Sequence, residues 1–371
     1  MAFQKIALTM AAASCLLLAG CGEDTTTDKK AEKAVASTEP LKAAWVYPSP
    51  RADEGWSKQH EEARMLIEQK YGDKIRTQVV DNVTNTVDAE RVIRDLAAQG
   101  NKIIFATSFT YMNPALKVAK EFPDVKFENC TGYKTAANYS NYNARFYQAR
   151  YLAGKLAASM SKTAHLGYVA AMPIPEVLQG INAYTLGAQS VNPDVKVSVV
   201  WTNTWYDPGK DATNTLIGQG CDILTHHTDS TAVPATAESR GVKVISYHSA
   251  MTKTAPKQLI GAVTHHWDEY YAHRIQALYD GKWKVEPVWG GAELHMVRLS
   301  AITPDAPKSV VEDINAVYSK MEKKEFNVFS GPIVDNEGKV QIPEGKVADD
   351  KMLNTMNYFV KGVIGKVPTG K

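Results

Sequence analysis

The sequence has few cysteines, four among 371 residues. Two of them, Cys15 and Cys21, lie near the start of the chain. The other two, Cys130 and Cys221, follow predicted strands in different halves of the chain, so we do not expect them to form a bridge. The cysteines therefore do not make a disulfide framework.

Neither sign of charge is in large excess, because the sequence has 42 lysines and arginines and 40 acidic residues. Surfaces that bind nucleic acid or anionic membranes carry concentrated positive charge. The balance indicates neither, and we expect no nucleic-acid partner.

Long apolar runs are absent after the first 20 residues, since no later stretch approaches the ~20 apolar residues of a membrane-spanning helix. The first 20 residues combine an early Lys5, an apolar stretch over residues 6–18 and small residues before Cys21. This is the pattern of a secretory signal. The segment Leu-Ala-Gly-Cys resembles the lipobox of bacterial lipoproteins, in which the cysteine is diacylated and becomes the mature N-terminus. The alternative is an ordinary signal with an incidental cysteine.

The segment after the signal is polar, charged and nearly free of large apolar residues, so it cannot support a core. We therefore expect a lipoprotein signal peptide over residues 1–20 and a flexible tether over residues 21–40. The folded part would lie in the cell envelope outside the cytoplasmic membrane, in the periplasm or at the cell surface. A lipid on Cys21 would anchor it there.

Apolar strand-like runs alternate with amphipathic helical patterns along the rest of the chain. The predicted strands cover residues 41–47, 74–80, 102–107, 125–129, 165–170, 195–201, 222–225 and 242–247. Helical patterns lie between them, and another covers residues 144–160. This alternation is typical of right-handed βαβ units, and it predicts an α/β fold with mainly parallel sheets flanked by helices.

About 330 residues exceed what one core usually organises, so two lobes are expected. We assign residues 41–157 plus 263–290 to the first lobe and residues 158–262 plus 291–371 to the second. Two segments, residues 258–264 and the region around residues 289–299, are expected to cross back between the lobes.

The loops after the predicted strands differ from those at the opposite ends. They carry aromatic, hydroxyl and charged residues: PSPRADEGWSKQH, TSFTYMNP, AMPIPE, NTWYDPGK, HHTDST and SYHSAM. The opposite ends are plain turns such as KYGDK, QGNK and RGVK. Ligands of open parallel sheets bind outside the carboxyl ends of the strands, so the sequence predicts a ligand cleft between the two lobes.

Four of the nine histidines occur as two doublets, His226 with His227 and His265 with His266. Adjacent residues leaving a strand point to opposite sides, so one doublet does not easily bind one ion. Neither doublet has a partner at the spacing of zinc motifs, and His-Glu-x-x-His is absent. We expect no metal site, and instead a single histidine that hydrogen-bonds a ligand. For His226 and His266 the alternative role is capping of strand carbonyl groups.

Catalytic motifs are missing as well. No Gly-x-Ser-x-Gly segment occurs, and neither Cys130 nor Cys221 has an obvious paired base. The C-terminal GKVPTGK imitates a phosphate loop, but neither Ser/Thr nor a helix follows it. We expect neither an enzyme activity nor a cofactor.

Two tryptophans at strand ends are better candidates for function. Trp56 and Trp205 lie on loops assigned to opposite lobes, with Phe109 and Tyr111 on the same edge. Flat side chains from facing lobes can clamp a flat ligand, and stacking a base on an aromatic ring contributes roughly 1–3 kcal/mol. The alternative is core packing, which we assign to Trp45 because it lies inside a strand.

Several segments together resemble one family. They are the lipobox and tether, GWSKQHEEA, ATSFTYMNPALKVAKEFPDVKFE, ARFYQARYLAGKLAASMSK, GYVAAMPIPEVLQGINAYTLGAQSVNP, NTWYDPGKDA and QGCDILTHHTDSTAV. In this order they are similar to the basic membrane protein (BMP) family over residues 41–335. Its members are substrate-binding lipoproteins of ABC transporters, of the purine nucleoside receptor type. The resemblance implies two lobes of the type I periplasmic-binding-protein fold and a purine ligand.

The resemblance also implies which residues hold the purine. Two family aromatics that sandwich the base match Trp56 and Trp205. Nucleoside-binding members hold ribose with an Asp and a Lys, where this sequence has His248 and His265. The acid that reads the base is replaced by Cys130 or Thr131.

These departures put a ribose-gripping site in doubt and favour a free base such as adenine. The base would be read by Glu176, Ser108 or Asp229. The complete set of predicted ligand-binding residues is Trp56, Ser108, Phe109, Tyr111, Glu176, Trp205, Asp207, His227, Thr228, Asp229 and His248.

The sequence thus predicts a lipid-anchored, monomeric receptor that captures a purine and delivers it to ABC permease and ATPase subunits. Two alternatives remain open: a receptor for another small heterocycle or a sugar, and a lipoprotein that senses its ligand and signals to a membrane partner. A hydrolase is disfavoured because a nucleophile with its base is missing.

Overall fold

The computed structural model describes residues 39–206 and 209–368. The predicted signal peptide, the predicted lipid acceptor Cys21, nearly all of the predicted tether and the candidate ligand residue Asp207 lie outside the described residues. In the described part of the chain, no helix is both long and apolar enough to cross a membrane.

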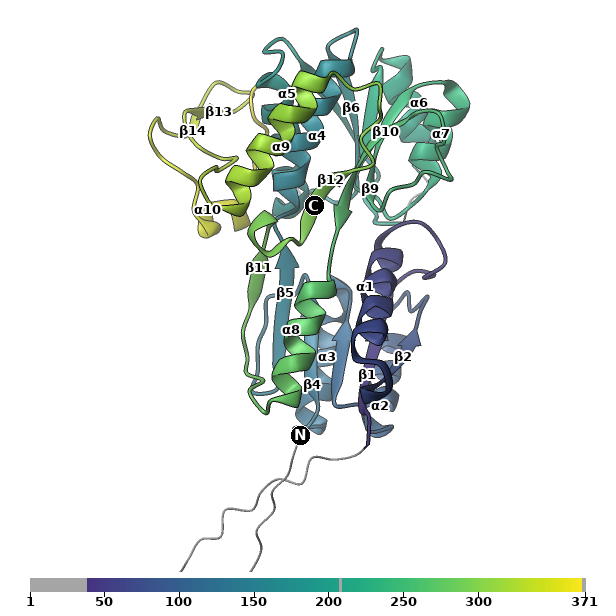
Figure 1. Cartoon of the computed structure of the whole chain (residues 1–371). Helices are drawn as coiled ribbons and strands as arrows, with labels where there is room; N and C mark the ends of the chain where they lie inside the picture. The colour runs from purple at the N-terminus through teal and green to yellow at the C-terminus, as the bar shows by residue number, and fades with distance from the viewer. Residues whose placement is uncertain (1–38, 207–208, 369–371) are drawn as a thin grey trace, which may run out of the picture. The chain divides into compact units, whose positions relative to one another are not determined.

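The first of two large sheets has six parallel strands in the order β11-β5-β4-β3-β1-β2. The strands are β1 (Leu41–Val46), β2 (Ile75–Val80), β3 (Ile103–Ala106), β4 (Lys126–Cys130), β5 (Tyr139–Ala144) and β11 (Val288–Gly290). The helical segments around them are α1 (Trp56–Tyr71), η1 (Gly72–Lys74), α2 (Thr86–Ala98), η2 (Phe109–Tyr111), α3 (Met112–Glu121) and α8 (Asp268–Tyr279), and Figure 1 labels the four α-helices. The prediction of βαβ units is confirmed here.

Alternation along β1 explains why this sheet is covered on both faces. Ala43 and Trp45 pack in the same cluster as the buried residues of α1 and α8. Ala44 and Val46 point to the other face, where they pack with the buried residues of α2 and α3. Successive strand side chains alternate between faces, so a strand covered on both sides reads as a continuous apolar run.

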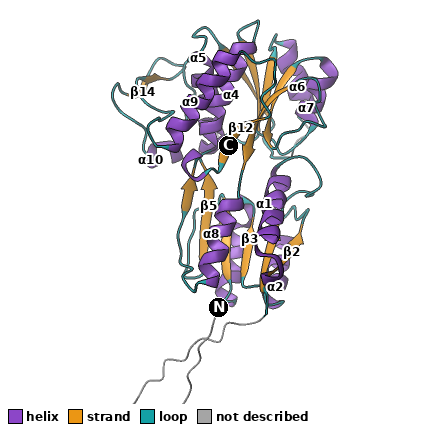
Figure 2. Ribbon diagram, viewed as in Figure 1, coloured by secondary structure: helices purple, strands orange, loops and turns teal. Residues whose placement is uncertain are grey.

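The second sheet has seven strands in the order β12-β10-β9-β8-β6-β7-β15. They are β6 (His165–Ala170), β7 (Lys196–Trp201), β8 (Ile223–His226), β9 (Lys243–His248), β10 (Leu259–His265), β12 (Val297–Ser300) and β15 (Val363–Ile364). All neighbours are parallel except β10 and β12. Its helices are α4 (Phe146–Met160), α5 (Pro175–Gln189), α6 (Lys210–Gly218), α7 (Ala232–Arg240) and α9 (Lys308–Glu322), drawn in purple in Figure 2.

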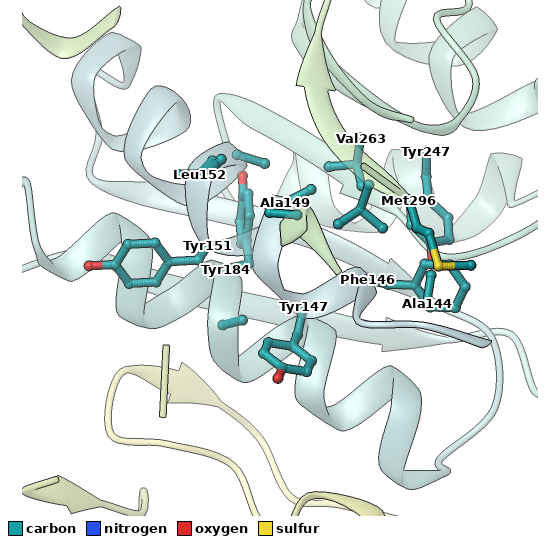
Figure 3. Packing of buried hydrophobic residues seen from close by; sticks show 14 of the residues in the cluster. Ala144, Phe146, Tyr147, Ala149, Tyr151, Leu152, Tyr184, Tyr247, Val263 and Met296 are labelled. Carbon is teal, nitrogen blue, oxygen red and sulfur yellow. The ribbon is translucent and has the colours of Figure 1, made fainter. Parts of the chain in front are cut away.

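Helix α4 packs very closely against α5. A Cβ atom on Gly154 would lie 2.0 Å from the Tyr184 carbonyl oxygen, and one on Gly187 would lie 1.9 Å from that of Tyr151. Figure 3 shows Leu152 and Tyr184 in this region, with Val263 of β10 nearby. The structure therefore groups α4 with the second sheet, whereas the predicted boundary at residue 157 left most of it in the first lobe.

The chain crosses between the two sheets at three places. These lie between β5 and α4, between β10 and α8, and between β11 and β12. The predicted crossing near residues 289–299 agrees with the third place. Residues 259–264 of the other predicted segment instead belong to β10 of the second sheet, and the crossing follows the end of β10 at His265.

The C-terminal part contains small elements that the sequence patterns did not indicate. They are η3 (Ala292–Leu294), the two-stranded sheet of β13 (Ile333–Val334) and β14 (Val340–Ile342), and α10 (Asp350–Asn354). Strand β15 pairs with β7 and completes the edge of the second sheet.

Candidate ligand-binding site

A cavity of about 860 Å³ is lined by residues of both lobes. From the first sheet and its loops come Pro48, Trp56, Ser108, Phe109, Thr110, Thr131, Gly132, Tyr133, Asn141, Asn143, Pro287, Val288 and Trp289. From the linker at Arg145, the second sheet and the C-terminal segment come Arg145, Ile174, Pro175, Glu176, Gln179, Trp205, Tyr206, His227, Asp229, Tyr247, His248, Asp350 and Asn354. Many of these residues follow the carboxyl ends of parallel strands, which is where ligands of such sheets bind.

Most of the predicted ligand residues line this cavity. Those that do are Trp56, Ser108, Phe109, Glu176, Trp205, His227, Asp229 and His248. Tyr111 and Thr228 do not. Tyr111 is fully buried and its hydroxyl donates to the Val83 carbonyl oxygen, while buried Thr228 faces the His226 ring, whose Nδ1 lies 3.1 Å from the Thr228 carbonyl oxygen.

Trp56 is the first residue of α1, and its ring is held on several sides. The indole Nε1 donates to the Thr107 carbonyl oxygen over 2.7 Å. The rings of His60, His248 and His265 lie edge-on to it, with centroid distances of 4.7, 5.4 and 5.6 Å. These contacts fix the orientation of an aromatic surface on the first-lobe wall.

Trp205 contributes an aromatic ring from the second lobe. It lies in the loop after β7, and its ring centroid is 6.0 Å from that of His227. Its carbonyl oxygen accepts a hydrogen bond of 2.7 Å from the Asp229 amide, which ties the β7 loop to the β8 loop.

Glu176 lies on the cavity wall and contacts polar side chains of both lobes. This residue is in the first turn of α5, and one carboxylate oxygen accepts from the Asn143 side chain of β5 over 3.1 Å. The other oxygen lies 3.8 Å from His227 Nε2. Burial lowers the pKa of His227 to about 4, even though Glu176 opposes that shift. His227 is therefore neutral at pH 7, and it offers one donor and one acceptor rather than a charge.

His248 and His265 lie behind and beside Trp56, with their ring centroids 5.2 Å apart. Burial is the main cause that holds the pKa of both well below the usual histidine range. His248 has a φ of 72°, a left-handed conformation that costs a residue with a side chain roughly 1–2 kcal/mol. Strain of this kind often marks a functional position.

The two histidines of each doublet have different surroundings. His226 Nε2 accepts from the Tyr247 amide over 3.2 Å, so this residue caps strand β9, while His227 lines the cavity. His266 lies 3.0 Å from the Thr264 hydroxyl, and His265 is buried. Within the described ranges, no group of three or more His, Cys, Asp or Glu residues is placed to hold a metal ion.

Sequence reasoning missed the part of the site near the first crossing. The Arg145 guanidinium makes two hydrogen bonds to the Asp350 carboxylate, of 2.8 and 2.9 Å, and lies 4.3 Å from the Trp289 ring centroid. All three residues line the cavity, as does Gln179, which donates to the Leu353 carbonyl oxygen over 2.9 Å. No local pattern reveals these pairs, because Arg145 and Asp350 are 205 positions apart.

The chain is similar to known substrate-binding proteins over nearly its whole length. Residues 41–336 match the Bmp family, described as ABC transporter substrate-binding protein PnrA-like. A purine-binding protein of Brucella abortus (strain 2308) is 47% identical over 339 residues, which are 90% of this chain and 96% of that protein. A Haloferax volcanii protein named putative ABC transporter glucose-binding protein is 35% identical over 333 residues, 89% of this chain and 82% of its own.

A solved structure with the same fold is the ABC transporter solute-binding protein from Conexibacter woesei. It aligns with a TM-score of 0.66 at 22% identity and covers 77% of this chain and 98% of its own. The predicted two-lobed, type I α/β architecture is thereby confirmed.

Members of this family bind substrates for ABC transporters and are not enzymes. This role implies a small-molecule ligand, permease and ATPase partners, and a place outside the cytoplasmic membrane. The match over residues 41–336 also confirms the resemblance seen in the sequence. The chain therefore belongs to the Bmp family of PnrA-like ABC transporter substrate-binding proteins.

Proposed function

We propose that this protein captures a purine between its lobes, with a free base such as adenine favoured over the nucleoside. The observation that carries the proposal is the pair Trp56 and Trp205, which line one cavity from opposite lobes. Two aromatic rings suit a flat ligand, and each stacked face contributes roughly 1–3 kcal/mol. The name of the 47% identical Brucella relative, purine-binding protein, supports the same ligand class.

The polar groups of the cavity fit the edge of a base. Glu176 offers carboxylate oxygens to ring N–H or amino donors, and neutral His227 beside it can donate or accept. Ser108 adds a hydroxyl from the first-lobe wall. A few polar groups in a mostly apolar cavity are the usual basis of small-molecule specificity.

The preference for a base rests on His248 and His265. Both are buried neutral rings packed around Trp56, in positions where nucleoside-binding relatives are expected to carry a ribose-holding acid and lysine. Neutral imidazoles lack the charge that strengthens hydrogen bonds to sugar hydroxyls. Replacing a charged pair by these two histidines should therefore weaken the binding of a nucleoside more than the binding of its base.

We further propose that the protein acts as a monomer held to the membrane by lipid on Cys21, and that it delivers the purine to its permease. A second ligand class, a sugar, has one specific support: the name of the 35% identical Haloferax relative, putative glucose-binding protein. Sensing without transport is the other alternative. Permease and ATPase genes beside the coding gene would favour transport.

The identity of the ligand can be tested without assuming it. Mass spectrometry of small molecules released by denaturing the purified protein should detect a purine base. Calorimetric titration with adenine, hypoxanthine, guanine, adenosine, ribose and glucose then ranks the classes. A nucleoside that binds much more tightly than its base would reject the base preference, and glucose binding without purine binding would reject the purine proposal.

A further inference from the structure

Helix α1 begins without a cap of its own. The residue before it is Gly55, which has no side chain, and its first turn contains no acidic residue. The first N–H groups of a helix have no partner within the helix, and a Ser, Thr, Asp or Asn side chain usually satisfies one of them. The Trp56 amide is one of these groups, and it belongs to the residue whose ring lines the cavity.

The missing cap comes from the opposite lobe. Asp229, in the loop after β8, accepts a 2.9 Å hydrogen bond from the Trp56 amide on Oδ1 and a 2.8 Å bond from the Ser49 hydroxyl on Oδ2. Its own amide donates to Trp205 within the second lobe. Asp229 therefore joins the two lobes through backbone and side chain together.

The first lobe is shaped to receive this carboxylate. A Cβ atom on Gly55 would lie 2.4 Å from Asp229 Oδ1, so only glycine permits this close approach. The Ser49 hydroxyl lies 2.7 Å from that of Ser57, in the first turn of α1, which orients it toward the carboxylate. A negative charge at a helix N-terminus is also favoured by the helix dipole.

A second contact joins the same two regions. The Thr254 hydroxyl, in the segment after β9, donates to Glu54 over 2.6 Å. Thr254 and Asp229 both belong to the second lobe, and Glu54 and Ser49 both precede α1 in the first. The lobes are thus connected on this side by protein groups alone.

We propose that Asp229 is a positioning residue, which caps α1 across the cleft, stabilises the closed arrangement of the lobes and holds Trp56 in place. In this role the two carboxylate oxygens accept from first-lobe donors, the Trp56 amide and the Ser49 hydroxyl, rather than from the ligand. The lobe-closing part does not depend on which ligand binds. Only the part that concerns stacking on Trp56 rests on the proposed purine function.

We call the hydrogen bonds of Asp229 to the Trp56 amide and the Ser49 hydroxyl the latch. The latch should affect the binding of every ligand equally. Opening the lobes would expose the α1 N-terminus and Asp229 to water, so the latch shifts the open–closed equilibrium toward the closed state. Apparent affinity scales with the population of the binding-competent state. Loss of the latch should therefore weaken all ligands by one common factor, whereas loss of a reading group weakens them selectively.

Hydrogen exchange of the ligand-free protein tests the latch directly. In Asp229→Ala, a peptide over residues 49–60 should exchange roughly fivefold faster, the factor equivalent to about 1 kcal/mol for a lost helix cap. Asp229→Asn should stay near the parent, because its amide oxygen can accept from the Trp56 amide and its NH₂ can donate to Ser49. Ser49→Ala, which does not line the cavity, should show a smaller acceleration.

Asp222→Ala is the matched control. Asp222 also accepts from backbone amides, of Lys162 and Thr163, but only within the second lobe. This variant should leave the exchange of residues 49–60 unchanged. If Asp229→Ala does not fold, Ser49→Ala carries the test.

Titration with adenine, hypoxanthine and guanine completes the experiment. Those of the three that bind the parent should weaken by the same factor in Asp229→Ala. Unchanged ligand-free exchange in Asp229→Ala and Ser49→Ala, or a loss confined to one base, would overturn the latch. If none of the bases binds the parent, the purine proposal fails, while the exchange measurement still decides the latch.

Discussion

At the scale of single residues, the proposed site combines the Glu176 carboxylate with neutral histidine rings. Glu176 is half-buried on the cavity wall and is oriented by Asn143 from the opposite lobe. Because a hydrogen bond to a charged group contributes roughly 1.5–3 kcal/mol, we expect Glu176→Gln to weaken adenine binding by about tenfold or more. Calorimetric titration measures this effect. The Glu238 carboxylate accepts hydrogen bonds from the Lys257 and Gln258 amides and does not line the cavity. The control variant Glu238→Gln should therefore bind adenine as the parent does.

If Glu176→Gln binds adenine unchanged, Glu176 does not read the base. The site would then depend on the rings and on His227 and Ser108.

The buried histidines predict a pH dependence of stability. Burial depresses the pKa of His60, His248 and His265 well below 6.5, so their neutral form is the one that fits the fold. Their contribution to stability is complete above the unfolded pKa of about 6.5 and is lost as pH falls below it. Each such histidine should lower the free energy of unfolding by roughly 1.4 kcal/mol per pH unit below that point.

Urea denaturation between pH 7.5 and pH 5.0 measures this slope. His265→Gln removes one titrating ring. The slope of the free energy of unfolding against pH should therefore decrease by the amount that corresponds to about one bound proton. Stability that does not change over this range would contradict the burial of neutral histidines.

Residues predicted from strand ends reach the cavity, whereas residues that reach it through distant pairing were not predicted. Trp56, Trp205 and His227 follow strands, and the structure places all three on one cavity. Arg145 and Asp350 reach that cavity through an ion pair between distant parts of the chain. Tyr111 and Thr228 lie in strand-end loops too, but their polar atoms turn to the backbone or a neighbouring ring.

At the scale of elements, apolar runs predicted most strands correctly. Strand β5 was missed because its sequence, YSNYNA, is polar although the strand is largely buried. Its polar atoms find partners that the sequence does not reveal: Tyr139 donates to the Met112 carbonyl oxygen, and Ser140 accepts from the Glu286 amide. Burial by tertiary contacts overrides the local pattern in such a strand.

The contact of α4 with α5 gives a prediction at this scale. Gly187→Ala would push a Cβ atom to 1.9 Å from the Tyr151 carbonyl oxygen, which is backbone and cannot move aside easily. We expect a loss of about 2 kcal/mol or more, since overpacking typically costs 1–3 kcal/mol. Thermal denaturation checks this value.

Gly218→Ala is the matched control for that variant. Gly218 ends α6, and a Cβ atom there would meet nothing within 4 Å. Because alanine is the better helix former, this change should be neutral or stabilise by up to about 1 kcal/mol. If both glycines tolerate alanine equally, α4 and α5 are not as closely packed as described.

At the scale of the whole molecule, the length of the chain and the alternation of strand and helix patterns were sufficient to predict two α/β lobes with a cleft between them. The lobe boundaries could not be predicted as well, because α4 follows a strand of the first sheet but packs on α5 and α9 of the second lobe. The C-terminal segment with α10 adds to the cavity wall, and its short strands have no periodicity to detect.

The proposed membrane attachment of the whole molecule depends on one atom, the Cys21 sulfur. Cys21→Ala removes the thiol that we propose accepts the lipid, so the protein should lose its acyl mass and its partitioning into detergent. Ligand binding should stay unchanged, since the cavity lies in residues 48–354. Mass spectrometry and phase partitioning measure both effects. A variant that remains membrane-bound without acyl mass would refute the lipobox interpretation.

The central claim is that a purine base binds between Trp56 and Trp205, and calorimetric titration of the parent, Trp56→Ala and Trp205→Ala with adenine and adenosine tests it most directly. Each variant should weaken adenine by about 1–3 kcal/mol, or roughly 5- to 150-fold, and the parent should bind adenine at least as well as adenosine. Trp201→Ala, which removes a ring of the second lobe outside the cavity, should leave adenine affinity unchanged. Undiminished adenine affinity in both Trp56→Ala and Trp205→Ala would contradict the account.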